Sequence, residues 1–352
     1  ENINNTGDFT SIGIYADIDY SITSKWNVFA GLRYSEDEKE FSWEVTPTTL
    51  NELYPGIANF IFDAYDKQTT SKTWDKVTGR IGTGYQISDD HMVFASYSTG
   101  YKAGGYDSLS PPETNPLTGE IYDTSFDPEE TSNFEIGYKG VMFDSLRTML
   151  AIYHTELDGR QRGISTNPPN DGSDFAVPGV TNEDITIDGI EIGLLWDITD
   201  SLSTGIVTDY RENEVQSEAF YGSDGKIVEP TTISGETNTS YTITLDWMPD
   251  LGLGNTKLHV DYVFAENARG LEIGNADWMN DIPGYFDDTE DLNARISWTS
   301  QGDALEIGIW GKNLLDNRYI GGAGGLAVEA LGTPITSINR GLETGVDVKY
   351  SF

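Results

Sequence analysis

The chain has 352 residues and a strongly acidic balance, with 58 Asp and Glu against 21 Lys and Arg and a net charge of −37. So few basic residues argue against a nucleic-acid partner, because contacts with phosphate need Lys and Arg. The lack of Cys excludes disulfides and thiolate metal sites, and no run of about 18 apolar residues is present to form a transmembrane helix.

Apolar and polar residues alternate along short segments from near the start of the chain. The first two such segments are 12–20 and 26–34, and the second has Trp26 and Tyr34 at its ends. A period of two predicts β-strands with one apolar and one polar face. The polar, acidic residues that follow, to about Gln68, predict a long loop.

The same alternation recurs to the end of the chain and predicts about thirteen strands in all. The later strands are expected at 74–87, 93–97, 130–140, 146–152, 183–197, 202–210, 237–248, 258–264, 292–298, 305–309 and 346–352. Long loops are expected at 102–128, 163–180, 213–236, 266–286 and 319–336, and the other connections are short turns.

Short and long connections alternate, so all the short turns fall at one end of the strands. The outward residue nearest a short turn is repeatedly aromatic, as in Trp26, Tyr85, Trp196, Trp247, Trp298 and Tyr350. Amphipathic rings favour the lipid headgroup level, so these residues predict a membrane girdle. The pattern indicates an all-β, transmembrane antiparallel β-barrel with short periplasmic turns and long extracellular loops. Alternation alone fits a soluble β-sandwich or propeller equally well.

Several segments carry a family resemblance when they are taken in series. They are 26–35 (WNVFAGLRYS), 93–105 (VFASYSTGYKAGG), 126–140 (FDPEETSNFEIGYKG), 188–196 (DGIEIGLLW), 313–319 (NLLDNRY) and 346–352 (VDVKYSF). Together they resemble the carboxyl-terminal half of a TonB-dependent outer-membrane receptor. The resemblance implies a 22-stranded barrel around an amino-terminal plug. Residues 1–352 would then be a carboxyl-terminal portion with the last ~13 strands, and the plug and the earlier strands would lie outside this chain.

The resemblance also implies a function and a place in the cell. We expect TonB-dependent active uptake of a scarce nutrient, such as a ferric siderophore, cobalamin or an oligosaccharide, across the bacterial outer membrane. A passive porin or structural barrel is the alternative. An outer-membrane enzyme is less favoured, because no catalytic set of residues stands out and no Gly-x-Ser-x-Gly motif is present.

The expected partners follow from the same reading. They are outer-membrane lipid and lipopolysaccharide, the nutrient ligand, the TonB complex through the missing amino-terminal part, and other envelope proteins. The alternating last strand, which ends at Phe352, is similar to the signal read by the barrel assembly machinery. On its own, it is simply a β-strand that ends in Phe.

Two groups of residues are candidates for the functional site. Strand registers point Arg33, Arg80, Glu135, Glu191 and Arg295 into the lumen, where we expect contacts with the plug or with neighbouring charges. The long loops carry Tyr101, Tyr106, Tyr122, Phe126, Trp278 and Tyr285, whose rings would bind a ligand by stacking. The alternative for these rings is that they pack a small core of the loops themselves.

No intrinsic cofactor or metal site is expected. The three His residues, at positions 91, 154 and 259, are scattered, and the acidic clusters at 36–38 and 287–291 do not match a calcium-binding loop. Solvated loops explain these clusters best. A lesser expectation is that Ca or Mg ions bridge them to anionic lipopolysaccharide.

Overall fold

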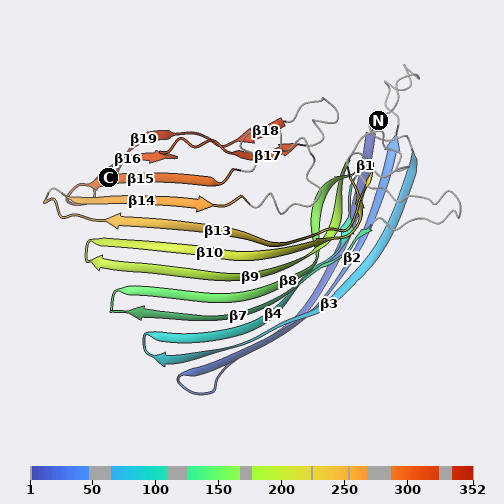
Figure 1. Ribbon diagram of the computed structural model, residues 1–352, viewed down its shortest axis with the longest axis horizontal. Helices are drawn as coiled ribbons and strands as arrows, with labels where there is room; N and C mark the ends of the chain where they lie inside the picture. Colours follow the sequence, from blue (N-terminus) through green and yellow to red (C-terminus); the bar gives the residue numbers. More distant parts are fainter. Residues whose placement is uncertain are drawn as a thin grey trace.

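A computed structural model describes residues 2–46, 65–108, 125–166, 177–222, 225–252, 254–267, 287–324 and 335–351. Its main feature is one curved, 13-stranded antiparallel sheet (Figure 1). In spatial order the strands are β1 (Asn2–Ser21), β2 (Trp26–Thr46), β3 (Tyr65–Ser88), β4 (His91–Lys102), β7 (Glu129–Met142), β8 (Leu146–Thr166), β9 (Val177–Thr199), β10 (Leu202–Ser217), β13 (Thr232–Trp247), β14 (Asn255–Ala265), β15 (Thr289–Thr299), β16 (Leu305–Lys312) and β19 (Glu343–Tyr350).

Three short ribbons extend the connections at the long-loop end of the sheet. They pair β5 (Gly105–Tyr106) with β6 (Ser125–Phe126), β11 (Phe220–Tyr221) with β12 (Ile227–Val228), and β17 (Ile320–Gly324) with β18 (Ile335–Ile338). The described residues form no helix that is long and apolar enough to cross a membrane.

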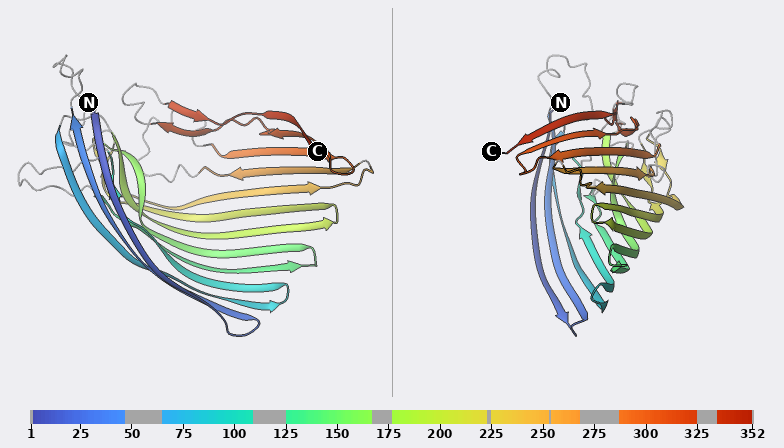
Figure 2. Two further views of the ribbon diagram at one scale, coloured as in Figure 1. Left: turned by 180° about the vertical axis from the view of Figure 1, so that it is seen from behind. Right: turned by 90° about the vertical axis from the view of Figure 1, so that its left-hand side faces the viewer.

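We call the 13-stranded sheet the wall. Each of its strands pairs with the wall strands before and after it in the chain, so the sheet is a meander that ends at β1 and β19. It bends into a trough, with its two edge strands facing across the open side (Figure 2). The predicted antiparallel all-β fold, with short and long connections in alternation, is confirmed. Closure into a full barrel needs further strands and stays a proposal.

Tight turns close the hairpins at the short-turn end. Phe143 and Asp144, between β7 and β8, both have positive φ angles, 54° and 59°. Two successive residues in this region form a turn whose twist matches that of antiparallel strands. The geometry therefore brings the two strands into pairing without a longer connection.

Several strands continue well beyond the predicted bounds. Residues 35–46 were expected in a loop, yet they are paired with β1, from Gly13 opposite Ser35 to Asn2 opposite Thr46. The prediction was wrong because acidic residues mask the alternation, which continues with Phe41 and Trp43 on one face. Parts of the expected loops at 102–128, 163–180, 213–236 and 319–336 are likewise strand.

The outward face of the wall is apolar and uncovered. Leu32, Ile81 and Val346 are 67%, 60% and 67% exposed. The predicted girdle residues also lie on this face, and all are exposed except Trp298, which is half-buried. So much exposed apolar surface on one side of a sheet is suited to lipid and not to water. Their position at the headgroup level stays a prediction.

Candidate functional site

Ion pairs join strands across the inner face of the sheet. Arg80 of β3 donates two hydrogen bonds to Asp17 of β1, each 2.9 Å long. Arg295 of β15 donates to Asp347 of β19 at 2.6 and 2.9 Å, and to Glu306 of β16 at 3.3 Å. Two of the predicted lumen arginines are therefore paired with acids of this chain.

The other predicted lumen residues have no ion pair within the described ranges. Arg33 has no carboxylate partner there, and neither Glu135 nor Glu191 has a basic one. Glu135 lies opposite Tyr153, and Glu191 lies opposite Asp209. Tyr153 donates to Asp209 at 2.8 Å, so the two glutamates flank a hydrogen-bonded pair on the inner wall. This part of the wall presents negative charge to the lumen.

An aromatic cluster forms on the inner face at the long-loop end of β2 and β3. Trp43 is fully buried and Trp74 is 6% exposed. The ring centre of Tyr106, from β5, lies 5.6 Å from that of Trp43 and 6.1 Å from those of Trp74 and Phe41. The Tyr106 ring thus packs on the wall, which favours the loop-core alternative for this residue. Its contact with a ligand stays untested.

Side chains of β2 hold the β5–β6 ribbon against the wall. Lys39 Nζ donates to the carbonyl of Gly104 at 2.6 Å, and Trp43 Nε1 donates to the carbonyl of Asp107 at 2.9 Å. Burial lowers the pKa of Lys39, against the opposing effect of nearby Asp37. Two part-buried hydrogen bonds therefore anchor the ribbon to β2.

Tyr101 lies beside this ribbon, at the end of β4. Its hydroxyl is buried and has no hydrogen-bond partner among the described residues. Burial, with the negative charges of Asp37, Asp75 and Glu130, raises the pKa of Tyr101 to about 12. The phenol therefore stays protonated at physiological pH. Phe126, in β6, is half-buried opposite Gly105. The remaining predicted residues Tyr122, Trp278, Tyr285 and Phe352 lie outside the described residues.

A buried carboxylate between two arginines marks the long-loop end of β8 and β9. Glu183 is 1% exposed, Arg162 Nε donates to its Oε2 at 2.7 Å, and Arg160 contacts its Oε1. The Arg162 guanidinium also lies 5.3 Å from the ring centre of Phe220. Sequence reasoning missed this clamp, because residues about 20 positions apart met only through the β8–β9 pairing.

The base of the ribbon is fixed to β8 and β9 by amide side chains. The Gln161 backbone N–H donates to Glu129 at 3.1 Å, and its side chain donates to the Asp127 carbonyl at 3.1 Å. The Asp127 N–H donates to the Asn182 side chain at 3.0 Å. These contacts explain the local role of the segment 126–130.

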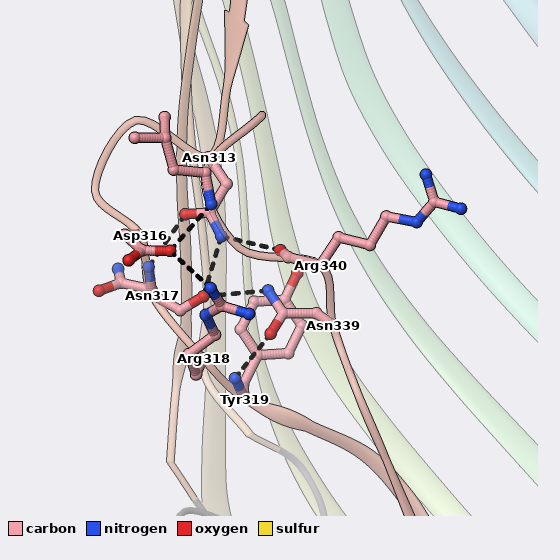
Figure 3. Close-up of polar contacts among 8 residues, drawn as sticks. Asn313, Asp316, Asn317, Arg318, Tyr319, Asn339 and Arg340 are labelled. Carbon is pink, nitrogen blue, oxygen red and sulfur yellow. Dashed lines mark hydrogen bonds and ion pairs between the residues drawn. The ribbon is translucent and has the colours of Figure 1, made fainter. Parts of the chain in front are cut away.

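A second polar network closes the last long connection (Figure 3). Asn313 Nδ2 donates to the carbonyls of Asn317 and Arg340 at 2.9 and 3.1 Å. Asn339 accepts from the Tyr319 N–H at 2.9 Å and donates to the Asn317 carbonyl at 3.1 Å. The segment 313–319 thus ties the chain after β16 to the chain before β19, which is a structural role.

The described part of the chain contains no group of three or more His, Cys, Asp or Glu residues arranged to hold a metal ion. Each His has a local partner instead. His91 bonds to the Tyr138 hydroxyl at 2.6 Å, while His154 and His259 each bond to a carboxylate. The expectation of Ca or Mg at the acidic loops stays untested.

Comparison with known proteins links this wall to one group. Residues 1–314 match the family model described as TonB dependent receptor-like, beta-barrel. The chain is 26% identical over 324 residues to the probable TonB-dependent siderophore receptor PiuA of Acinetobacter baumannii, covering 88% of this chain and 37% of that protein. It is 25% identical over 272 residues to the vitamin B12 transporter BtuB of Photobacterium profundum, covering 75% and 39%.

Solved structures show the same fold. The ferric yersiniabactin uptake receptor FyuA from Yersinia pestis superposes with a TM-score of 0.66 at 16% identity, over 99% of this chain and 47% of that one. The structure of PiuA from Acinetobacter baumannii gives a TM-score of 0.66 at 18% identity, over 97% and 43%. The chain spans less than half the length of each of these relatives.

Proposed function

Because the chain belongs to the TonB-dependent receptor-like β-barrel family, we propose that it is the carboxyl-terminal part of a receptor that imports a scarce nutrient. Its place is the bacterial outer membrane. The observation that carries the proposal is the family match over residues 1–314. The relatives described above are a siderophore receptor and a vitamin B12 transporter, so a ferric siderophore or similar chelate, or cobalamin, is the proposed cargo.

The two faces of the sheet suit this task. The outward apolar face contacts lipid, and the inner wall carries the charges that a plug would contact. In this proposal, Glu135 and Glu191 offer carboxylates to basic groups of the plug, because neither has an ion pair within the described residues. The plug and the TonB-contacting segment belong to parts of the receptor outside this chain.

The β5–β6 ribbon gives the mouth of the barrel its shape. Its anchors, Lys39 and Trp43, hold Tyr106 on the inner wall. We propose that ligand is first captured in this region, with Tyr101 and Phe126 beside it.

Uptake by cells that carry or lack the full-length gene tests the proposal. Labelled ferric siderophores and cobalamin are offered one at a time, with and without a protonophore that collapses the proton-motive force. We expect uptake of one ligand that saturates at low concentration and falls to the level of the deletion strain when the protonophore is added. Uptake that persists without the proton-motive force and rises linearly with concentration would identify a passive pore instead.

A further inference from the structure

One arrangement recurs on the inner wall of the sheet. A long side chain lies across a glycine on the neighbouring strand and reaches a carboxylate on the strand beyond. Arg80 of β3 lies across Gly31 of β2 and binds Asp17 of β1 at 2.9 Å. A Cβ on Gly31 would lie 3.3 Å from Arg80 Cγ, so the glycine leaves the path open.

The same arrangement is found at two other places in the wall. Arg295 of β15 lies across Gly308 of β16, where a Cβ would meet its guanidinium carbon at 2.6 Å, and binds Asp347 of β19. Tyr153 of β8 lies across Gly189 of β9, where a Cβ would overlap its ring, and binds Asp209 of β10 at 2.8 Å.

Arg33 of β2 repeats the first two parts of this arrangement. Its guanidinium lies across Gly13 of β1, where a Cβ would meet Nη2 at 2.6 Å. The register matches that of Arg295, because Gly13 lies opposite Ser35 as Gly308 lies opposite Ser297. In both cases the arginine is two residues before the serine.

The third part, the carboxylate, is missing for Arg33. Its Nε donates to the Ser35 hydroxyl at 2.9 Å, and no acid of the described residues pairs with it. Every other arginine in the described ranges has a carboxylate partner. A shortage of acids does not explain this, since the chain has 58 Asp and Glu against 21 Lys and Arg.

The position of the missing partner follows from the sheet. Asp347 lies opposite Gly308, so the corresponding carboxylate would lie opposite Gly13, on a strand paired with β1. Among the described strands, β1 pairs with β2 alone and leaves its other edge free. A free edge of 20 residues is a strong template for a further strand. Arg33 also borders a hollow of about 340 Å³ that it shares with Tyr15.

The next strand of the larger barrel pairs with the free edge of β1, and we propose that the residue of that strand opposite Gly13 is an Asp or Glu bound by Arg33. This pair would be the fourth case in which a long side chain crosses a glycine and binds a carboxylate on the strand beyond. This inference rests on the proposed function only in taking the sheet as part of a larger barrel wall.

Zero-length crosslinking in the full-length receptor tests the pairing. A carbodiimide joins a lysine amine to a carboxylate that it touches, so Arg33→Lys is prepared in outer membranes and the crosslinked peptides are identified by mass spectrometry. We expect the amine introduced at position 33 to be joined to an Asp or Glu of the barrel strand that lies beside β1, and not to an acid of the plug, in a species with the mass of one receptor. Arg295→Lys is the matched control, because Arg295 contacts Asp347 and Glu306 within this sheet.

The outcomes separate clearly. The inference is overturned if the amine introduced at position 295 joins Asp347 or Glu306 while the one at position 33 joins nothing, joins an acid of the plug, joins an acid within residues 1–352, or joins a second copy of the receptor. A structure of the unsubstituted full-length receptor measures the same contact, with a carboxylate oxygen expected within about 3.2 Å of the Arg33 guanidinium. Neither readout depends on transport, so a failed uptake experiment leaves this inference standing, and the reverse also holds.

Discussion

At the scale of single residues, the site depends on charges whose partners are distant in sequence. Glu183 is buried between Arg160 and Arg162, and Trp43 is buried beneath the β5–β6 ribbon. The sequence alone did not predict either residue, because their burial arises from strand pairing and from a ribbon about 60 positions away. Arg80 and Arg295 were predicted on the inner wall, because a period of two fixes the face of each residue.

Removing the charge of Glu183 leaves two arginines without their shared carboxylate. Because Glu183 is the shared acceptor of hydrogen bonds from both guanidinium groups, Glu183→Gln is expected to destabilise this end of β8–β10 by about 1.5–3 kcal/mol. Hydrogen exchange of the backbone amides around 180–187 measures the change. Glu212→Gln, at an exposed position of β10, is the matched control and is expected to leave exchange unchanged. Equal exchange in the two variants would show that the clamp contributes nothing.

Removing the charge of Asp158 is expected to stabilise the protein, unlike removal of the Glu183 charge, and this effect depends on pH. Burial, and then the negative charges of Asp184, Glu156 and Glu130, raise its pKa above the ordinary value of 3.8. A raised pKa in the folded state means that the stabilising contribution is complete below pH 3.8 and is lost as the pH rises through the folded pKa.

Asp158→Asn is therefore expected to raise the melting temperature at pH 7, with a gain of up to about 1 kcal/mol, typical of exposed charge interactions. Well below pH 3.8 the carboxyl is neutral in both the folded and the unfolded state, so the variant and the original protein are expected to melt together. Melting curves across the pH range give the comparison. A gain of the same size at both ends of the range would assign the effect to something other than this charge.

At the scale of elements, alternation predicted the wall strands well and the ends of the strands poorly. Segments such as 237–248 and 292–298 were predicted within a few residues, because lipid requires a continuous apolar face there. β2 continues past the apolar band to Thr46 with acidic residues on its outer face. No lipid contact requires apolar residues there, so the sequence does not show the alternation that predicts a strand. The β5–β6 ribbon has only two residues in each strand, which is too short for any periodicity.

The packing of that ribbon predicts a specific glycine requirement. A Cβ at Gly104 would meet the Trp74 ring at 2.7 Å, so Gly104→Ala is expected to push the ribbon off the wall at a cost of about 1–3 kcal/mol. Faster hydrogen exchange at residues 103–108 reports the release. Gly163→Ala, where a Cβ would meet no atom within 4 Å, is the matched control. Identical protection in both variants would contradict the packing described here.

At the scale of the whole molecule, a net charge of −37 sets a general electrostatic property. Mutual repulsion of this size opposes compact folding and is screened by salt, with a Debye length of about 10 Å at 0.1 M and about 3 Å at 1 M. We expect the melting temperature to rise with NaCl concentration. If divalent ions bind the acidic loops, CaCl2 is expected to raise the melting temperature more than NaCl at the same ionic strength. An equal rise with the two salts would contradict calcium binding.

The central claim also concerns the whole molecule: the sheet presents one face to lipid and the other to a polar lumen. The chain has no Cys, so nitroxide labels can be attached at single introduced cysteines along β13 in outer-membrane vesicles. Labels at Ile243 and Leu245 are expected to collide mainly with oxygen dissolved in lipid, while labels at Thr242 and Thr244 are not. Collision rates that alternate in this way support the account, and rates without a period of two, or with Ile243 and Leu245 open to a water-soluble nickel complex, would contradict it.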